Sequence, residues 1–184
     1  MTMKKVGLFL AEGLEEIEGL TVVDILRRAG VEVITISIHG KKEVIGAHDI
    51  TILADTVFEE VDFATLDGVV LPGGMPGTMN LMQHSGVNTV IQEFATSGKL
   101  VSAICAAPSV LGKAGLLEGK KATSYPGFEE QLIGATVTTE KVVTDGNIIT
   151  SRGMGTAIPF ALALTAYFVG EEKAQELSTA IIYE

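Results

Sequence analysis

The sequence predicts a three-layer α/β sandwich built on a largely parallel sheet. Segments of strand length and segments of helix length alternate along most of the chain. The run at 68–71, Gly-Val-Val-Leu, is apolar on both faces, as expected of a parallel strand that helices cover on both sides. No linker, repeat or low-complexity segment interrupts the alternation. We therefore expect one domain that spans residues 1–184.

The elements follow from apolar periodicity and from the glycines and prolines that end each segment. They are a βαβ opening (strand 5–10, helix 15–28, strand 31–38), a strand piece at 50–53, strands at 68–71 and 100–104, helices at 87–96 and from 108 to 112 or beyond, a hairpin of 142–144 with 148–150, and apolar final helices. Ligands of such sheets bind beyond the carboxyl ends of the strands. The acidic loop after the first strand, the turn at 72–74 and Cys105 all fall at such ends.

Composition excludes several classes of function. The formal charge of −10 arises from 23 acidic and 13 scattered basic residues, which opposes binding to nucleic acid. The longest apolar segment, 157–169, is too short for a membrane span and is interrupted by Pro159 and Thr165. One cysteine allows no internal disulfide, and the short apolar stretch near the N-terminus does not have the pattern of a signal peptide. We expect a cytoplasmic protein.

Cys105, the only cysteine, is a candidate nucleophile. It lies where an apolar strand meets a helix-opening run of small residues, so a tight turn would lift its side chain out of the sheet. The N–H groups and dipole of the following helix would favour the thiolate. The alternative is a buried, inert cysteine, since free cysteine is among the most buried residue types. The position at a turn favours the reactive thiol.

Glu18 is the candidate proton carrier. It lies one helical turn from Val22 and two from Ile25, so it is expected to share their inward face and to point along the top of the sheet. Burial and a nearby thiolate would both raise its pKa and leave a carboxyl that donates to sulfur. Glu15 and Glu16 are instead interpreted as exposed carboxylates that complement the helix dipole.

The turn at Gly73-Gly74 is a candidate oxyanion site. Without Cβ atoms the backbone can approach a ligand closely, and the N–H groups of Gly74 and Ala106 could hold an oxyanion formed by attack of Cys105. An ordinary turn is the alternative, because most glycine pairs serve only that purpose. The run 151–156 is interpreted as a helix entrance with Thr156 as N-cap.

Other catalytic signatures are missing from the sequence. The three histidines lie far apart without partners at metal-ligand spacing, so no metal site is expected. There is no phosphate-binding loop and no G-x-S-x-G. No histidine is placed to activate the thiol, and Tyr125, the aromatic residue of the later loop that is the candidate to return to it, is a poor base at neutral pH.

The chain resembles the ThiJ/PfpI superfamily, in the branch of the Parkinson-disease-associated deglycase and its bacterial homologues. The segments that carry the resemblance are 11–18 (AEGLEEIE), 70–74 (VLPGG), 103–108 (AICAAP), 150–156 (TSRGMGT), and Asp24 with Arg27-Arg28. The resemblance implies a flavodoxin-like sandwich, a homodimer, and Cys105 at a nucleophile elbow hydrogen-bonded to Glu18. It also supports Gly74 and Ala106 as oxyanion donors.

The function implied by the resemblance is cofactor-free conversion of methylglyoxal to lactate, or release of early glycation adducts, in oxidative and carbonyl stress. One departure is Tyr125, because many members place a histidine there, which leaves a histidine-assisted route unavailable. The main alternative is a redox sensor or stress chaperone in which Cys105 is oxidised to the sulfinate. A peptidase or amidase would need a recruited histidine, such as His48 across a dimer interface, and Ala106 after the cysteine disfavours that function.

Overall fold

A seven-stranded sheet forms the centre of the molecule in the computed structural model, which describes residues 3–183. The strand order is β10-β11-β7-β6-β1-β2-β5, and every neighbouring pair is parallel except β10 with β11. The strands are β1 Lys5–Leu10, β2 Glu32–Ser37, β5 Thr56–Val57, β6 Gly68–Leu71, β7 Leu100–Ile104, β10 Val142–Asp145 and β11 Ile148–Ser151. This arrangement confirms the predicted parallel sheet.

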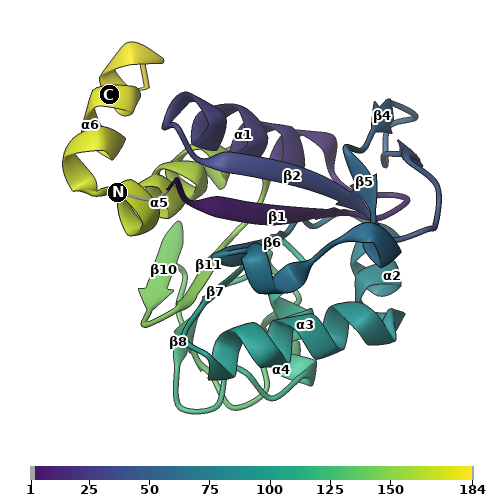
Figure 1. Ribbon diagram of the computed structural model, residues 1–184. Coiled ribbons are helices and arrows are strands. Elements are labelled where there is room, and N and C mark those ends of the chain that lie inside the picture. The colour runs from purple at the N-terminus through teal and green to yellow at the C-terminus, as the bar shows by residue number, and fades with distance from the viewer. Residues whose placement is uncertain (1–2, 184) are drawn as a thin grey trace.

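Helices cover both faces of the sheet (Figure 1). Alternate residues of β1 show why: Leu8 and Leu10 pack with α1 and α5, whereas Phe9 packs into the core on the side of α3 and α4. Helix α6 lies outside α5. The helices are α1 Glu16–Arg28, α2 Gly77–Gln83, α3 Ser85–Thr96, α4 Pro108–Lys113, α5 Ala157–Val169 and α6 Glu171–Ala180. The three layers predicted from the sequence are therefore present.

Two small sheets and four short 3₁₀ turns complete the described residues. The hairpin β3–β4 is antiparallel, whereas β8 and β9 form a parallel pair. Their bounds are β3 Glu43–Ile45, β4 Thr51–Leu53, β8 Lys121–Ala122 and β9 Thr136–Val137, with 3₁₀ turns at Phe58–Glu60, Phe63–Thr65, Glu129–Gln131 and Met154–Thr156.

The predicted elements agree with the structure where the apolar pattern is strong. Strands β1, β6 and β7 coincide with the predicted 5–10, 68–71 and 100–104, and the hairpin turns at Gly146-Asn147 as expected. Helix α2 and the strands β3, β5, β8 and β9 were not predicted, and each of these strands has only two or three residues, too few to reveal a period. Among the described residues, no helix is both long enough and apolar enough to cross a membrane.

Candidate active site

Four loops meet at one edge of the sheet. Strands β1, β6, β7 and β11 are parallel neighbours, so their carboxyl ends point the same way. The loops that follow them carry the acidic segment before α1, the Pro72-Gly73-Gly74 turn, Cys105, and the run before α5. The edge where ligands bind in such folds is therefore the edge that holds the predicted site.

Cys105 has the backbone of a strained turn. Its φ is +66°, in the left-handed region that non-glycine residues adopt rarely. The backbone is held on both sides, because the N–H of Cys105 donates to the carbonyl of Ser151 (3.0 Å) and its carbonyl accepts from the N–H of Tyr125 (2.8 Å). The side chain is half-buried. This geometry confirms the predicted strand-to-helix turn at the cysteine.

Glu18 lies on the buried face of α1, as predicted, with only 1% of its surface exposed. Its Oε2 accepts a hydrogen bond from the N–H of Gly73 (2.9 Å). Its Oε1 is buried and has no hydrogen-bond partner among the described residues. Burial raises the pKa of this carboxyl to about 7, and the nearby charge of Glu15 adds to the shift. Glu18 can therefore gain or lose a proton close to neutral pH.

The Glu18 carboxyl lies against the Cys105 thiol. Burial, together with the charge and hydrogen bond of ionised Glu18, raises the pKa of Cys105 to about 12, whereas the N–H groups of Ala106 and Gly74 lower it. The expectation that the helix N-terminus makes this thiol acidic is therefore wrong, because desolvation outweighs the N–H donors. When Glu18 carries the proton, its charge disappears and the carboxyl can donate to sulfur. Between these two values the pair holds one proton, which rests on sulfur while Glu18 is ionised, and transfer of that proton to Glu18 would generate the thiolate.

The glycine pair fits closely around these two side chains. A Cβ on Gly73 would lie 2.5 Å from the Cβ of Cys105 and 2.7 Å from Oε2 of Glu18. Gly74 has φ +89°, and a Cβ there would collide with the backbone N of Glu15. The N–H of Gly73 serves Glu18, whereas the N–H groups of Gly74 and Ala106 are directed at the sulfur. Those last two are the donors predicted for an oxyanion.

Tyr125 lies beside the site. Its backbone binds Cys105, and its ring packs near Gly153, where an added Cβ would lie 3.2 Å from ring carbon Cδ2 and 4.0 Å from Oε1 of Glu18. Half of Tyr125 is exposed. Thr156 precedes α5 as predicted, but its hydroxyl donates to the Gly153 carbonyl and accepts from the Gly153 N–H rather than capping the helix. Gly153 therefore lines the candidate site beside Tyr125 and Glu18, which was not predicted from the sequence.

Glu16 corrects the sequence analysis. It is 3% exposed rather than solvated, and its carboxylate accepts hydrogen bonds from the backbone N–H of His48 (2.8 Å) and from the ring Nδ1 (2.9 Å). Burial raises the pKa of Glu16, but the bonds to His48 outweigh it and lower that pKa overall, and the ring bond raises the pKa of His48. Glu15, Glu16 and His48 place possible ligand atoms within 4.8 Å of one another, which is the spacing of a metal site. The ion pairs of His48 with the two glutamates explain this proximity without a metal ion. No sequence spacing links His48 to α1, so only the fold reveals the contact.

Comparisons with known proteins agree with this geometry. The model of the DJ-1/PfpI family matches residues 4–167. The chain is 41% identical to protein dj-1beta of Drosophila melanogaster over 97% of both chains, and 35% identical to a protein named a deglycase from Pyrococcus abyssi over 82% of this chain and 91% of the relative. The solved structure of Toxoplasma gondii DJ-1 in its oxidized form superposes with a TM-score of 0.94 at 34% identity and covers 98% of each chain.

The extent of these matches settles the family and the fold. The resemblance carried by the five sequence segments is confirmed, as is the flavodoxin-like arrangement that it implied. This chain belongs to the DJ-1/PfpI family.

Proposed function

We propose that this protein is a cofactor-independent enzyme of the glyoxalase or deglycase type, with a role in carbonyl and oxidative stress. Its substrates would be methylglyoxal and related α-oxoaldehydes, or their early glycation adducts. The observation that carries the proposal is the contact between strained Cys105 and buried Glu18, whose Oε1 has no partner among the described residues. The deglycase name of the Pyrococcus abyssi relative supports it.

The reaction begins with attack of the Cys105 sulfur on the aldehyde carbon. Formation of the C–S bond converts the carbonyl oxygen to an oxyanion, which the N–H groups of Gly74 and Ala106 are placed to stabilise. Glu18 takes up the thiol proton as sulfur becomes nucleophilic and then delivers it to the oxyanion. The product of this step is a neutral hemithioacetal on Cys105.

Glu18 then moves protons along the substrate. Its carboxylate removes the hydrogen on the carbon bonded to sulfur, and the resulting enediol regains a proton at the neighbouring carbon, which gives a thioester of lactate. Water cleaves the thioester, so that lactate leaves and the thiol is regenerated. Methylglyoxal plus water therefore gives lactate with no net oxidation or reduction. Because Oε1 of Glu18 has no hydrogen-bond partner among the described residues, it can contact the substrate without first losing a hydrogen bond.

The decisive experiment is lactate formation from methylglyoxal, with glutathione omitted and a metal chelator present. We expect turnover by the wild type and none by Cys105→Ala. Both lactate enantiomers are measured, since a single enantiomer indicates protonation on one face of the enediol by a fixed group. Lactate formation that persists in Cys105→Ala contradicts the proposed nucleophile, and no turnover by the wild type contradicts the glyoxalase reaction.

A second candidate function is redox sensing, in which Cys105 is oxidised to the sulfinate. The N–H groups of Gly74 and Ala106 and a protonated Glu18 would stabilise sulfinate oxygens as they would an oxyanion. The Toxoplasma gondii DJ-1 structure is described as oxidized. A mass increase of about 32 Da at near-stoichiometric peroxide, in a protein that does not form lactate, favours this function, including a chaperone role triggered by oxidation.

We also propose that the protein is a cytoplasmic homodimer. A lone nucleophilic thiol is best preserved in a reducing compartment. The hairpin β3–β4 and the outer face of α1 expose five large apolar side chains, namely Ile17, Leu20, Ile45, Ile50 and Leu53. Sedimentation analysis is expected to show a dimer that Leu20→Glu dissociates, whereas Ile133→Glu, at an even more exposed position on another part of the chain, leaves it intact. A monomeric wild type contradicts the dimer.

A further inference from the structure

Helix α5 is apolar around its whole circumference but is covered on only part of it. None of its 13 residues is charged. Phe160, Ala161 and Leu164 are fully buried, whereas Leu162 and Ala163 are only half-buried. Helices that are apolar on every side are normally buried on every side. The uncovered face of α5 therefore needs an explanation that the candidate active site does not supply.

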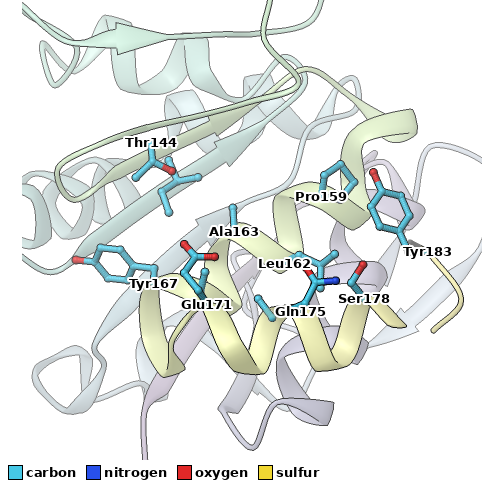
Figure 2. A pocket seen from close by; sticks show the side chains of 12 residues that line it. Thr144, Pro159, Leu162, Ala163, Tyr167, Glu171, Gln175, Ser178 and Tyr183 are labelled. Atoms are coloured by element: carbon cyan, nitrogen blue, oxygen red, sulfur yellow. The ribbon is translucent and has the colours of Figure 1, made fainter. Parts of the chain in front are cut away.

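This face forms the floor of a groove of about 530 Å³ between α5, α6 and the β10–β11 hairpin. The volume is within the usual range of small-molecule sites. Figure 2 shows Tyr167 and Glu171 at one end of the groove, Pro159 and Tyr183 at the other, and Ala163 between them. None of the lining residues belongs to the candidate active site.

The charge of the lining selects the ligand. Among the described residues that line the groove, Glu171 is the only charged one, and no Lys, Arg or His is among them. No salt bridge engages Glu171 within the described residues. An anionic ligand would be repelled by the Glu171 carboxylate, whereas a cation would gain that carboxylate and the aromatic ring of Tyr167 at the same end. The half-buried apolar side chains next to them suit a hydrocarbon body.

We propose that this groove binds a small organic cation: an amine whose ammonium group pairs with Glu171 beside Tyr167 and whose apolar body lies over Leu162 and Ala163. Glu171 is in the first turn of α6, where acidic residues also complement the helix dipole. Its neighbour Glu172 is in the same turn but does not line this groove. Substitution of either glutamate would remove its interaction with the helix dipole, but only substitution of Glu171 would also remove a group that contacts the ligand.

The test is calorimetric titration of the intact protein with 4-phenylbutylamine, with 4-phenylbutyrate as an anion of the same shape. We expect the amine to bind and the butyrate not to bind. Glu171→Gln should weaken binding of the amine by about tenfold or more, because it removes a charge-assisted hydrogen bond. Glu172→Gln should leave binding unchanged. Both positions are exposed, so neither substitution is expected to disturb the fold.

Ala163→Phe fills the middle of the groove and is expected to abolish binding, with circular dichroism to establish that the variant is folded. Shifts in the NMR signals of the Leu162 and Ala166 methyl groups, observed on addition of the amine, would locate the ligand. Absence of binding up to millimolar amine overturns the proposal. Equal binding of the butyrate, or equal affinity in the wild type and Glu171→Gln, overturns it as well.

Discussion

The backbone N–H of Gly73 donates a 2.9 Å hydrogen bond to Oε2 of the buried Glu18. This bond links the turn after β6 to the first turn of α1 and fixes the carboxyl beside the Cys105 thiol. It satisfies one carboxyl oxygen and leaves the other, Oε1, without a partner among the described residues. A buried polar atom without a partner is costly in a folded protein. Its presence here is understood if that oxygen serves the substrate.

Substitution of Gly73 by alanine should separate the two side chains. The new Cβ would lie 2.5 Å from the Cβ of Cys105 and 2.7 Å from Oε2 of Glu18, so the pair must move apart. We expect loss of most lactate formation and destabilisation by about 1–3 kcal/mol, the usual cost of overpacking. Gly155→Ala is the matched control, because a Cβ there meets no atom within 4 Å. Equal activity of the two variants contradicts the close fit.

Glu18→Gln keeps the hydrogen-bond acceptor for Gly73 but removes the exchangeable proton. We expect lactate formation to fall about 10²–10⁴-fold, the usual contribution of a general acid–base. In the wild type, burial and ionised Glu18 hold the pKa of Cys105 at about 12, so alkylation of the free thiol should rise only at high pH. In the variant the charge of Glu18 is gone, so the pKa of the thiol should fall and the alkylation profile should move to lower pH. A variant with an unchanged profile and full activity rules out proton sharing.

The raised pKa of Glu18 also makes stability depend on pH. The folded protein retains this proton up to about pH 7, whereas the unfolded chain releases it near 4.5. The folded state therefore binds more protons between these values, and the contribution of Glu18 to stability falls as pH rises through this window and does not change further above it. The loss amounts to at most about 3 kcal/mol. Urea unfolding at several pH values should show this decline in the wild type but not in Glu18→Gln.

The sequence predicted the central sheet and the chemistry at its edge because both depend on local patterns. The apolar runs at 68–71 and 100–104 are long enough to identify buried strands, and Cys105 follows one of them directly. The helical spacing of Glu18 with Val22 and Ile25 placed the carboxyl on the buried face, which the structure confirms.

The sequence could not predict contacts made by distant segments. Burial of Glu16 depends on His48, 32 residues away, in a loop between strands of three residues each. Gly153 becomes a wall of the site only because the loop before α5 packs against the ring of Tyr125. The pKa of Cys105 was predicted in the wrong direction since the extent of desolvation depends on the complete fold.

The pair of Glu16 and His48 should stabilise the protein only within a window of pH. Because the pKa of His48 is raised in the folded protein, His48 stabilises the fold fully below the ordinary pKa of histidine. This stabilisation is lost as pH rises through the raised pKa. Because the pKa of Glu16 is lowered in the folded protein, Glu16 stabilises the fold above the ordinary pKa of glutamate. This stabilisation is lost as pH falls through the lowered pKa. We therefore expect the interaction between the two side chains to be stronger near pH 6 than at about pH 9.

A double-mutant cycle of Glu16→Gln and His48→Ala, followed by urea unfolding at both pH values, measures this interaction directly. The backbone N–H of His48 still donates to residue 16 in His48→Ala, so the cycle isolates the ring. The loop also donates from the N–H of Ala47 to the carbonyl of Leu14, next to the acidic segment of the site. Hydrogen exchange at residues 46–49 should therefore accelerate in His48→Ala at the lower pH. A coupling energy that is the same at both pH values would show that the bond does not depend on the charge of His48.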